Sequence, residues 1–298
     1  MKRINRGINI INISIVIVLL LVSVITAQPQ ISISETIVNM GDTIKVDLIN
    51  KRPLTKKKIG FAGRSFELIR LKKKKGKYRY RAYVAASRKL KTNSYPLKVY
   101  YQEANQPKGV QQFQIQVNHP EKRKGKVTLS RKKNRLSKSH KQLQKEARII
   151  TKGFKQMSSK PYFKYSFIMP AKGKLTSGFG VQREYNGSYQ RSHAGVDIAN
   201  KVNTRVVAPN HGKVVLSKRL KIHGNTVMID HGMGIVTIYN HLHQRKVRHN
   251  QVVKKGDLIG VIGKTGVATG PHLHWGMSVQ NVRVDPLFWV KKNKFLYD

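Results

Sequence analysis

Short stretches in which apolar and polar residues alternate fill the first third of the chain. They read QISISETIV, TIKVDLIN, SFELIRL, KYRYRAYVA, YPLKVYY and VQQFQIQV, and turn-forming sequences such as MGD, KKGK and NQPKG lie between them. Alternation with a period of two is typical of strands with one buried face, and closely spaced strands of this kind favour an antiparallel β-sandwich. We therefore expect residues 28–119 to form a small β-sandwich domain.

The rest of the chain changes pattern twice. Residues 120–165 are strongly basic and poor in large aromatic residues, and a weak helical period runs through Leu143, Ala147 and Ile150, so we expect a basic, partly helical linker. From residue 166 to residue 298, glycines separate short runs rich in Val and Ile, which indicates tightly turned antiparallel β structure rather than βαβ units. The expected fold class is therefore mostly β, with two β domains.

Residues 1–27 have the layout of a secretory signal. Lys2, Arg3 and Arg6 precede an apolar run that extends to Ile25, and the segment ends in small residues at Ala27. About 20 apolar residues are also enough to cross a bilayer, so an uncleaved N-terminal anchor is the alternative. In both cases the remainder of the chain is expected to be exported, and contact with a membrane is expected only if this segment is retained.

The chain is very basic, because 59 Lys and Arg residues stand against 13 Asp and Glu residues, which gives a formal net charge of +46. A positive charge of this size favours binding to a polyanion, such as nucleic acid, an anionic membrane or an acidic polymer of the cell envelope. AT-rich coding would account for some of the lysines but not for the scarcity of acidic residues. Export argues against nucleic acid, which leaves anionic envelope polymers as expected partners.

Two histidine-containing motifs carry the candidate chemistry. HAGVDIA places His193 and Asp197 four residues apart, and HLH places His272 and His274 on the same face of one expected strand. Because the chain has no cysteine, a transition metal must be held by imidazoles and carboxylates. A hydrolytic zinc site needs three protein ligands and an open position for water, and His193, Asp197 and one histidine of the HLH pair meet that count. The other histidine of the pair would then be free as a general base.

The other histidines divide into two groups. The segment YNHLH repeats the one-apart spacing with His241 and His243, and spacing alone does not decide which of them would supply a further imidazole. The remaining histidines are expected to be ordinary surface or core residues: His119, His140, His211, His223, His231 and His249.

Taken together, HAGVD, YNHL and TGVATGPHLHW resemble the motifs of the lysostaphin-type zinc metallopeptidases, a family of peptidoglycan endopeptidases. The resemblance implies a small antiparallel β domain with a groove floored by zinc. Position by position, it makes His193, Asp197 and His274 the zinc ligands. His272 and His241 match the family's two catalytic histidines, and which of these two is the general base stays open.

The resemblance covers the chain from residue 167 to residue 286. Within this range, Asn203 and Asn250 stand where the family usually has glycine in turns. Asparagine tolerates the left-handed backbone, so these turns are expected to persist. His243 lies outside the family's motif. A β-sandwich ahead of the peptidase also resembles the arrangement of exported bacterial members.

The expected function is that of a zinc-dependent endopeptidase that hydrolyses peptide cross-links of bacterial peptidoglycan, in the periplasm or elsewhere in the cell envelope. One alternative is a non-catalytic regulator or wall-binding protein that keeps the peptidase fold. Another is a metallopeptidase that acts on proteins or glycine-rich peptides outside the wall. The sandwich and the basic segment could also lie over the groove and hold the enzyme inactive until it binds the wall.

Overall fold

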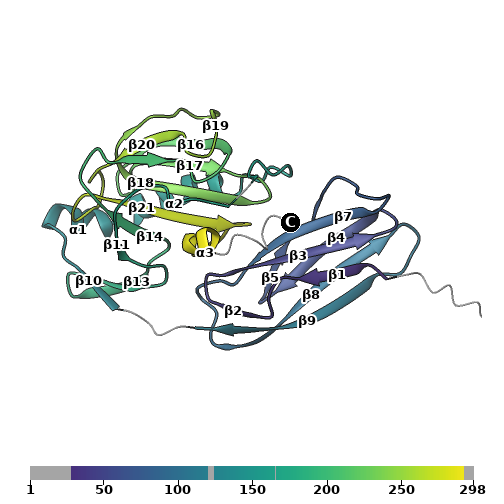
Figure 1. Ribbon diagram of the computed structural model, residues 1–298. Coiled ribbons are helices and arrows are strands. Elements are labelled where there is room, and N and C mark those ends of the chain that lie inside the picture. Colours follow the sequence, from purple (N-terminus) through teal and green to yellow (C-terminus); the bar gives the residue numbers. More distant parts are fainter. Residues whose placement is uncertain (1–27, 120–123, 165, 292–298) are drawn as a thin grey trace, which may run out of the picture.

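A computed structural model describes residues 28–119, 124–164 and 166–291, and it contains two β domains joined by a helical segment (Figure 1). The mostly β fold class predicted from the sequence is confirmed. The signal or anchor segment expected over residues 1–27 lies outside the described residues. Within the described residues, no helix has both the length and the apolar character needed to cross a membrane.

The N-terminal domain is a sandwich of two sheets. One sheet has the order β1 (Gln30–Ile33), β3 (Thr43–Asn50), β7 (Tyr78–Ala85) and β6 (Ile69–Arg70). The other has the order β2 (Ile37–Asn39), β9 (Gly109–Asn118), β8 (Asn93–Glu103), β4 (Leu54–Phe61) and β5 (Arg64–Phe66). Neighbouring strands are antiparallel apart from the parallel pair β2 and β9.

Alternation along the strands gives this domain its core. In β3, Ile44, Val46 and Leu48 are fully buried, while the residues between them are only partly covered. Leu97 and Val99 of β8, on the opposite sheet, are buried in the same core. Burying one face of each sheet against the other is what makes a sandwich of such strands stable.

The basic segment that follows packs on the C-terminal domain. Its strand β10 (Lys124–Val127) pairs in parallel with β12 (Gln182–Tyr185), and β13 (Ser188–Ser192) completes a three-stranded sheet. Two helices come next, α1 (Arg131–Ser137) and α2 (His140–Phe154). Ile150 and Phe154 of α2 are buried in one cluster with Leu220, Met228, Val236 and Ile238. The helical period expected in the linker corresponds to α2, whose apolar face lies against the sheet of the C-terminal domain.

The C-terminal domain is built on a ten-stranded sheet. Its main path runs β11 (Lys174–Ser177), β14 (Val196–Ala199), β21 (His272–Val279), β18 (Ile235–Arg245), β17 (Gly224–Asp230), β16 (Gly212–Leu220) and β19 (Val252–Val253). β20 (Leu258–Ile262) pairs with β18 and with β15 (Arg205–Val207), and β22 (Val282–Val284) pairs with β21. All of these pairs are antiparallel. The short helix α3 (Pro286–Lys291) lies between this sheet and the sandwich (Figure 1).

The two β domains share one hydrophobic core. Trp289 of α3 packs against Tyr83 of the sandwich, with ring centroids 5.2 Å apart, and Phe163 contacts both rings. The Asp285 backbone N–H donates to the Gly41 carbonyl oxygen over 2.9 Å. Because these contacts join the sandwich to α3 and to the segment before it, the sandwich is fixed against the C-terminal domain.

Candidate metal centre

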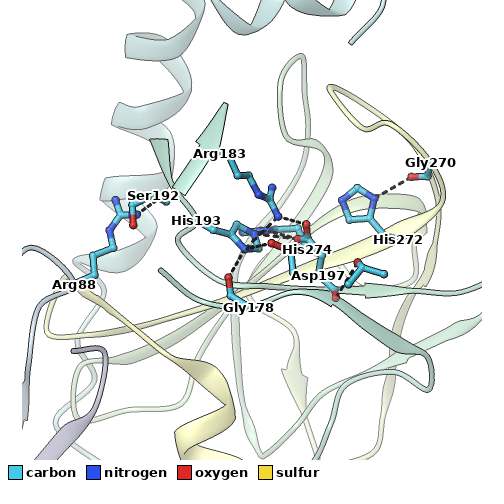
Figure 2. A network of polar contacts seen from close by, with 11 residues as sticks. Arg88, Gly178, Arg183, Ser192, His193, Asp197, Gly270, His272 and His274 are labelled. Carbon is cyan, nitrogen blue, oxygen red and sulfur yellow. Dashed lines mark hydrogen bonds and ion pairs between the residues drawn. The ribbon is translucent and has the colours of Figure 1, made fainter. Parts of the chain in front are cut away.

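The pairing of β14 with β21 brings three of the predicted site residues together. These strands are antiparallel neighbours, and their register places Asp197 opposite His274. His193 lies just before β14, and its side chain points toward the same place (Figure 2). One ligand atom from each of these three residues lies within 4.8 Å of the other two. The trio expected from the sequence therefore converges on one point.

The three ligand atoms form a tight triangle. Asp197 Oδ1 lies 3.1 Å from His193 Nε2 and 3.0 Å from His274 Nδ1, and the two nitrogens are 2.9 Å apart. His193 Nδ1 lies 2.8 Å from the Gly178 carbonyl oxygen, which can only accept, so Nδ1 carries the proton and Nε2 presents a lone pair. Two imidazole nitrogens and a carboxylate oxygen are a donor set that zinc and related divalent ions bind. The trio fits such an ion.

The charges at the trio also suit a cation. Burial lowers the pKa of His274 to about 3, so its imidazole is neutral at neutral pH. Burial by itself would raise the pKa of Asp197, but the contacts of its carboxylate with the His193 and His274 side chains outweigh burial and bring this pKa below its usual range. An ionised carboxylate beside a neutral imidazole is the protonation state that metal ligation needs.

Arg183 is a member of the site that the sequence did not reveal. From β12, its Nη2 donates to Asp197 Oδ2, the carboxylate oxygen that the two imidazoles do not share (Figure 2). The contact fixes the plane of the carboxylate and leaves Oδ1 facing the imidazoles, which is how a second contact usually orients a metal ligand. No motif singled this residue out, because it is one of 59 Lys and Arg residues.

Two further imidazoles, His241 and His272, lie beside the trio. Their ring centroids are 4.9 Å apart, and the His241 ring is 6.4 Å from that of His274. His241 Nδ1 donates to the Thr265 carbonyl oxygen over 2.8 Å, and His272 Nδ1 donates to the Gly270 carbonyl oxygen over 2.9 Å. In the neutral state both Nε2 atoms therefore carry lone pairs and can accept a proton.

His241 is held in an unusual backbone conformation. Its φ is 64°, in the left-handed region that residues other than glycine rarely adopt. Its backbone N–H donates to the His223 carbonyl oxygen over 3.0 Å. Burial, followed by the charges of His272 and His274, lowers the pKa of His241 well below its ordinary value, so this imidazole is neutral at neutral pH.

All five predicted site residues line a single cavity of about 1310 Å³. Its other walls include residues of β10, α1, α2, β12 and β22, of the segment before β21 and of the sandwich. His243, which the YNHLH spacing left open, is exposed and lies outside this lining. Of the two histidines in YNHLH, His241 lines the cavity, and its assignment to the site stays a prediction.

His223 departs from the ordinary role expected for it, because it lines the cavity. Its Nδ1 donates to Glu146 Oε2 over 2.6 Å, and its backbone N–H and that of Ile222 donate to the same carboxylate. Glu146 belongs to α2, so the helix holds the turn between β16 and β17 at the edge of the site. His231, by contrast, is the core residue expected, with bonds to the His211 carbonyl oxygen and to Thr237 Oγ1.

Residues 191–286 match the model of peptidase family M23. This stretch of the chain is similar to an M23 peptidase domain. The matched range contains all five predicted site residues, from the trio to the two further imidazoles, and it includes β14, β18 and β21, which position them. Arg183 and Glu146 lie before its first matched residue.

Named relatives match a part of the chain of about the same length. The peptidoglycan DD-endopeptidase ShyB of Vibrio cholerae is 35% identical over 115 residues, which is 38% of this chain and 27% of ShyB. The DD-carboxypeptidase/endopeptidase Mpg of Neisseria meningitidis is 34% identical over 114 residues, which is 38% of this chain and 26% of Mpg. The chain thus spans about a quarter of the length of these curated relatives.

A solved structure is similar to more of the chain than residues 191–286. It is a crystal structure described as a peptidase M23 from Pseudomonas aeruginosa, with 26% sequence identity and a TM-score of 0.59. The similarity covers 82% of this chain and 92% of that chain, so it includes the sandwich as well as the C-terminal domain. The order of the two β domains is therefore shared with a known M23 structure.

Proposed function

We propose that this chain is a zinc-dependent endopeptidase that hydrolyses peptide cross-links of peptidoglycan, and that it acts after export in the periplasm or elsewhere in the cell envelope. The observation that carries the proposal is the convergence of His193, Asp197 and His274 beside two imidazoles whose Nδ1 atoms donate to backbone carbonyl oxygens, which leaves a lone pair on each Nε2. The names of ShyB and Mpg supply the substrate class. The net charge of +46 favours accumulation on an anionic wall polymer.

In this proposal His193, Asp197 and His274 hold the zinc ion. When bound, zinc supplies Lewis-acid polarisation of a peptide carbonyl and makes water acidic enough to attack near neutral pH. The chain's own contribution begins with orientation: the Gly178 carbonyl oxygen fixes the His193 tautomer, and Arg183 fixes the Asp197 carboxylate. Both contacts are made by backbone or side-chain groups outside the trio, so the trio is preorganised.

In this proposal His272 and His241 carry out the proton transfers. Each has Nδ1 engaged by a backbone carbonyl oxygen, so Nε2 is the atom that takes a proton from the attacking water or returns it to the leaving amine. The imidazole that is not acting as the base can stabilise the oxyanion that develops on the scissile carbonyl. We assign the pair together, because the two rings are neighbours and their tautomers are fixed in the same way.

The proposal is tested with the purified full-length chain, isolated peptidoglycan sacculi and purified cross-linked muropeptide dimers. We expect cleavage of the cross-link, loss of cleavage on chelation and recovery when zinc is restored. His193→Ala should abolish both zinc binding and cleavage. His243→Ala is the matched control, since this exposed histidine lies outside the cavity, and it should cleave at the wild-type rate. Full cleavage by His193→Ala would overturn the proposal.

A second variant separates metal binding from proton transfer. His272→Ala should retain zinc at wild-type stoichiometry but lose about 10²- to 10⁴-fold in kcat, the usual contribution of a positioned acid or base. Metal analysis and kinetics on the same preparation give both readouts. A zinc-loaded wild-type chain that cleaves no peptidoglycan, oligoglycine or casein would instead support a regulator that keeps the peptidase fold.

A further inference from the structure

Two arginines without an acidic partner lie in the same cavity as the histidines. Arg88 comes from the sandwich, just after β7, and Arg283 comes from β22 of the C-terminal domain. Among the described residues, the ion pairs involve other cations, and neither of these arginines has a carboxylate within reach. The chain has 13 acidic residues, but none of the described ones pairs with these two guanidinium groups. An anion from outside the chain could therefore serve as their partner.

The Arg283 side chain is held in place by packing, but one of its hydrogen-bond donors has no partner among the described residues. Its guanidinium stacks on the ring of Phe154, 3.8 Å from the centroid, so the last residue of α2 holds its plane. Its Nη1 atom is shielded from solvent and has no hydrogen-bond partner among the described residues. A buried donor left unpaired is costly, and native proteins rarely keep one unless a ligand or water completes it.

Arg88 stands close to the metal trio. Its Nη1 donates to the carbonyl oxygen of Ser192, the residue before the predicted ligand His193 (Figure 2). Burial lowers the pKa of Arg88, and burial together with the positive charge of Arg88 lowers the pKa of Arg283 to about 9. Arg283 still carries its charge at neutral pH, and the positive charge of Arg88 disfavours that charge, so an anion bound beside Arg283 would be stabilised.

We propose that Arg88 and Arg283 form a carboxylate-binding subsite that holds a free carboxylate of the substrate peptide while its scissile bond lies at the histidines. The inference rests on the proposed function and adds a specificity determinant to it. A guanidinium fork matches the two oxygens of a carboxylate, and a rigidly stacked one loses little freedom on binding. The subsite has one arginine from each domain, so the sandwich contributes directly to substrate recognition.

Two free carboxylates of a cross-linked wall peptide lie nearest the cross-link and are compared: the carboxyl of the diamino acid next to it and the C-terminus of a stem. The test therefore compares three purified muropeptide dimers: one with both carboxylates free, one amidated at the diamino acid and one amidated at the C-terminus. The full-length wild type, Arg283→Met, Arg283→Lys and the control Arg219→Met are assayed on each. Arg219 is exposed on β16 outside the cavity, so its variant removes a charge without touching the subsite.

We expect Arg283→Met to raise KM about 10-fold or more on the dimer with both carboxylates free, in line with loss of a charge-assisted hydrogen bond, with a smaller change in kcat. Amidation of the recognised carboxylate should raise the wild-type KM by a similar factor, and Arg283→Met should then add nothing further. The amidated position that has this effect identifies the source of the carboxylate. The KM of Arg283→Lys should lie between those of the wild type and Arg283→Met, and the KM of Arg219→Met should match that of the wild type.

Equal losses by Arg283→Met on all three dimers, or no loss on any, would overturn the subsite while leaving cross-link hydrolysis intact. Binding is measured separately, by calorimetry on the full-length His272→Ala chain, with an uncross-linked stem tetrapeptide and two carboxamides of it, one amidated at the diamino acid and one at the C-terminus. Weaker binding of either carboxamide, with the difference absent in the His272→Ala/Arg283→Met chain, supports the subsite even if no dimer is cleaved. Equal binding of all three peptides counts against it, so the two proposals can fail independently.

Discussion

At the scale of single residues, the site is set by backbone carbonyl oxygens that fix imidazole tautomers. His193, His241 and His272 each donate from Nδ1 to a carbonyl, those of Gly178, Thr265 and Gly270. The three acceptors lie in the sequences TSGFG, GKTG and ATGPH, which are glycine-containing turns. The turns thus have a chemical role, because each leaves one Nε2 lone pair directed at the cavity.

Asn203 and Asn250 occupy turn positions at which the related family usually has glycine. Asn203 and Asn250 have φ of 71° and 67°, so the left-handed turns expected at both positions are present. Asn250→Gly should leave the free energy of unfolding within a few tenths of 1 kcal/mol of the wild type, whereas Asn250→Val should lower it by about 1–2 kcal/mol, because a β-branched side chain crowds this backbone.

Urea unfolding of the two variants checks this prediction. Asn250 is exposed, so neither substitution alters a core contact, and the comparison isolates the backbone. If Asn250→Val were as stable as Asn250→Gly, the turn would not be held in the left-handed region in solution.

Most of the site could be predicted from the sequence because its members lie in short motifs with fixed spacing. His272 and His274 share a strand face, and HAGVDIA places His193 four residues from Asp197. The resemblance then selected His241 over His243. Arg183 and His223 could not be found in this way. Arg183 acts through an ion pair with Asp197, which lies in another sheet. His223 is held at the cavity by Glu146, a carboxylate 77 residues away in the chain.

At the scale of elements, α2 is tied to the site by a single buried carboxylate. Glu146 is 1% exposed and accepts hydrogen bonds from Gln142, from His223 and from the backbone of Ile222. Burial would raise the pKa of Glu146, but the bond from His223 and the backbone bonds outweigh burial and lower it to about 2. The helix therefore holds the turn that neighbours His241 through an ionised side chain.

Glu146→Gln should lower the free energy of unfolding by about 1–3 kcal/mol at pH 7, because an amide NH₂ would face donors that the carboxylate now accepts from. The folded-state pKa lies below the ordinary value of 4.5, so the wild-type advantage is complete above that value and is lost as the pH falls toward 2. Urea titrations at pH 7, 5 and 3 measure the difference. Glu67→Gln, at an exposed side chain, is the control and should change little.

A difference in the free energy of unfolding between wild type and Glu146→Gln that stayed constant down to pH 3 would show that the carboxylate charge is not what holds the helix.

The fold itself was less predictable at this scale than the site. β4 reads LTKKKIGF, and three consecutive lysines hide its alternation. Lys57 and Lys58 lie over the rings of Tyr80 and Tyr100, so aromatic contacts that no local pattern records accommodate them.

At the scale of the whole molecule, the question is whether the two β domains unfold together. The core is continuous across their junction, where Tyr83, Phe163 and Trp289 pack edge to face or tilted. Gln280 adds a pair of hydrogen bonds with the backbone of Glu67, at 2.7 and 3.0 Å. Sequence patterns mark domains by composition and could not foresee a junction built from single aromatic residues of three distant segments.

A core substitution far from the junction tests this coupling. Leu97 is fully buried inside the sandwich, so Leu97→Ala should cost about 2–5 kcal/mol there. Trp275 is buried in the C-terminal domain and Trp289 lies at the junction, so the fluorescence of a Trp289→Phe background reports the C-terminal domain through Trp275. If the shared core couples the domains, the fluorescence midpoint in urea falls together with the circular dichroism midpoint in Leu97→Ala.

The partly exposed neighbour Tyr100 provides the matched control, since Tyr100→Ala removes an aromatic side chain from the same strand without opening the core and should move neither midpoint by much. A fluorescence midpoint that stays at the wild-type value in Leu97→Ala would mean that the domains unfold independently. In that case the position of Arg88 over the cavity would depend on docking rather than on a common fold, and substrate recognition by the sandwich would weaken whenever the junction opened.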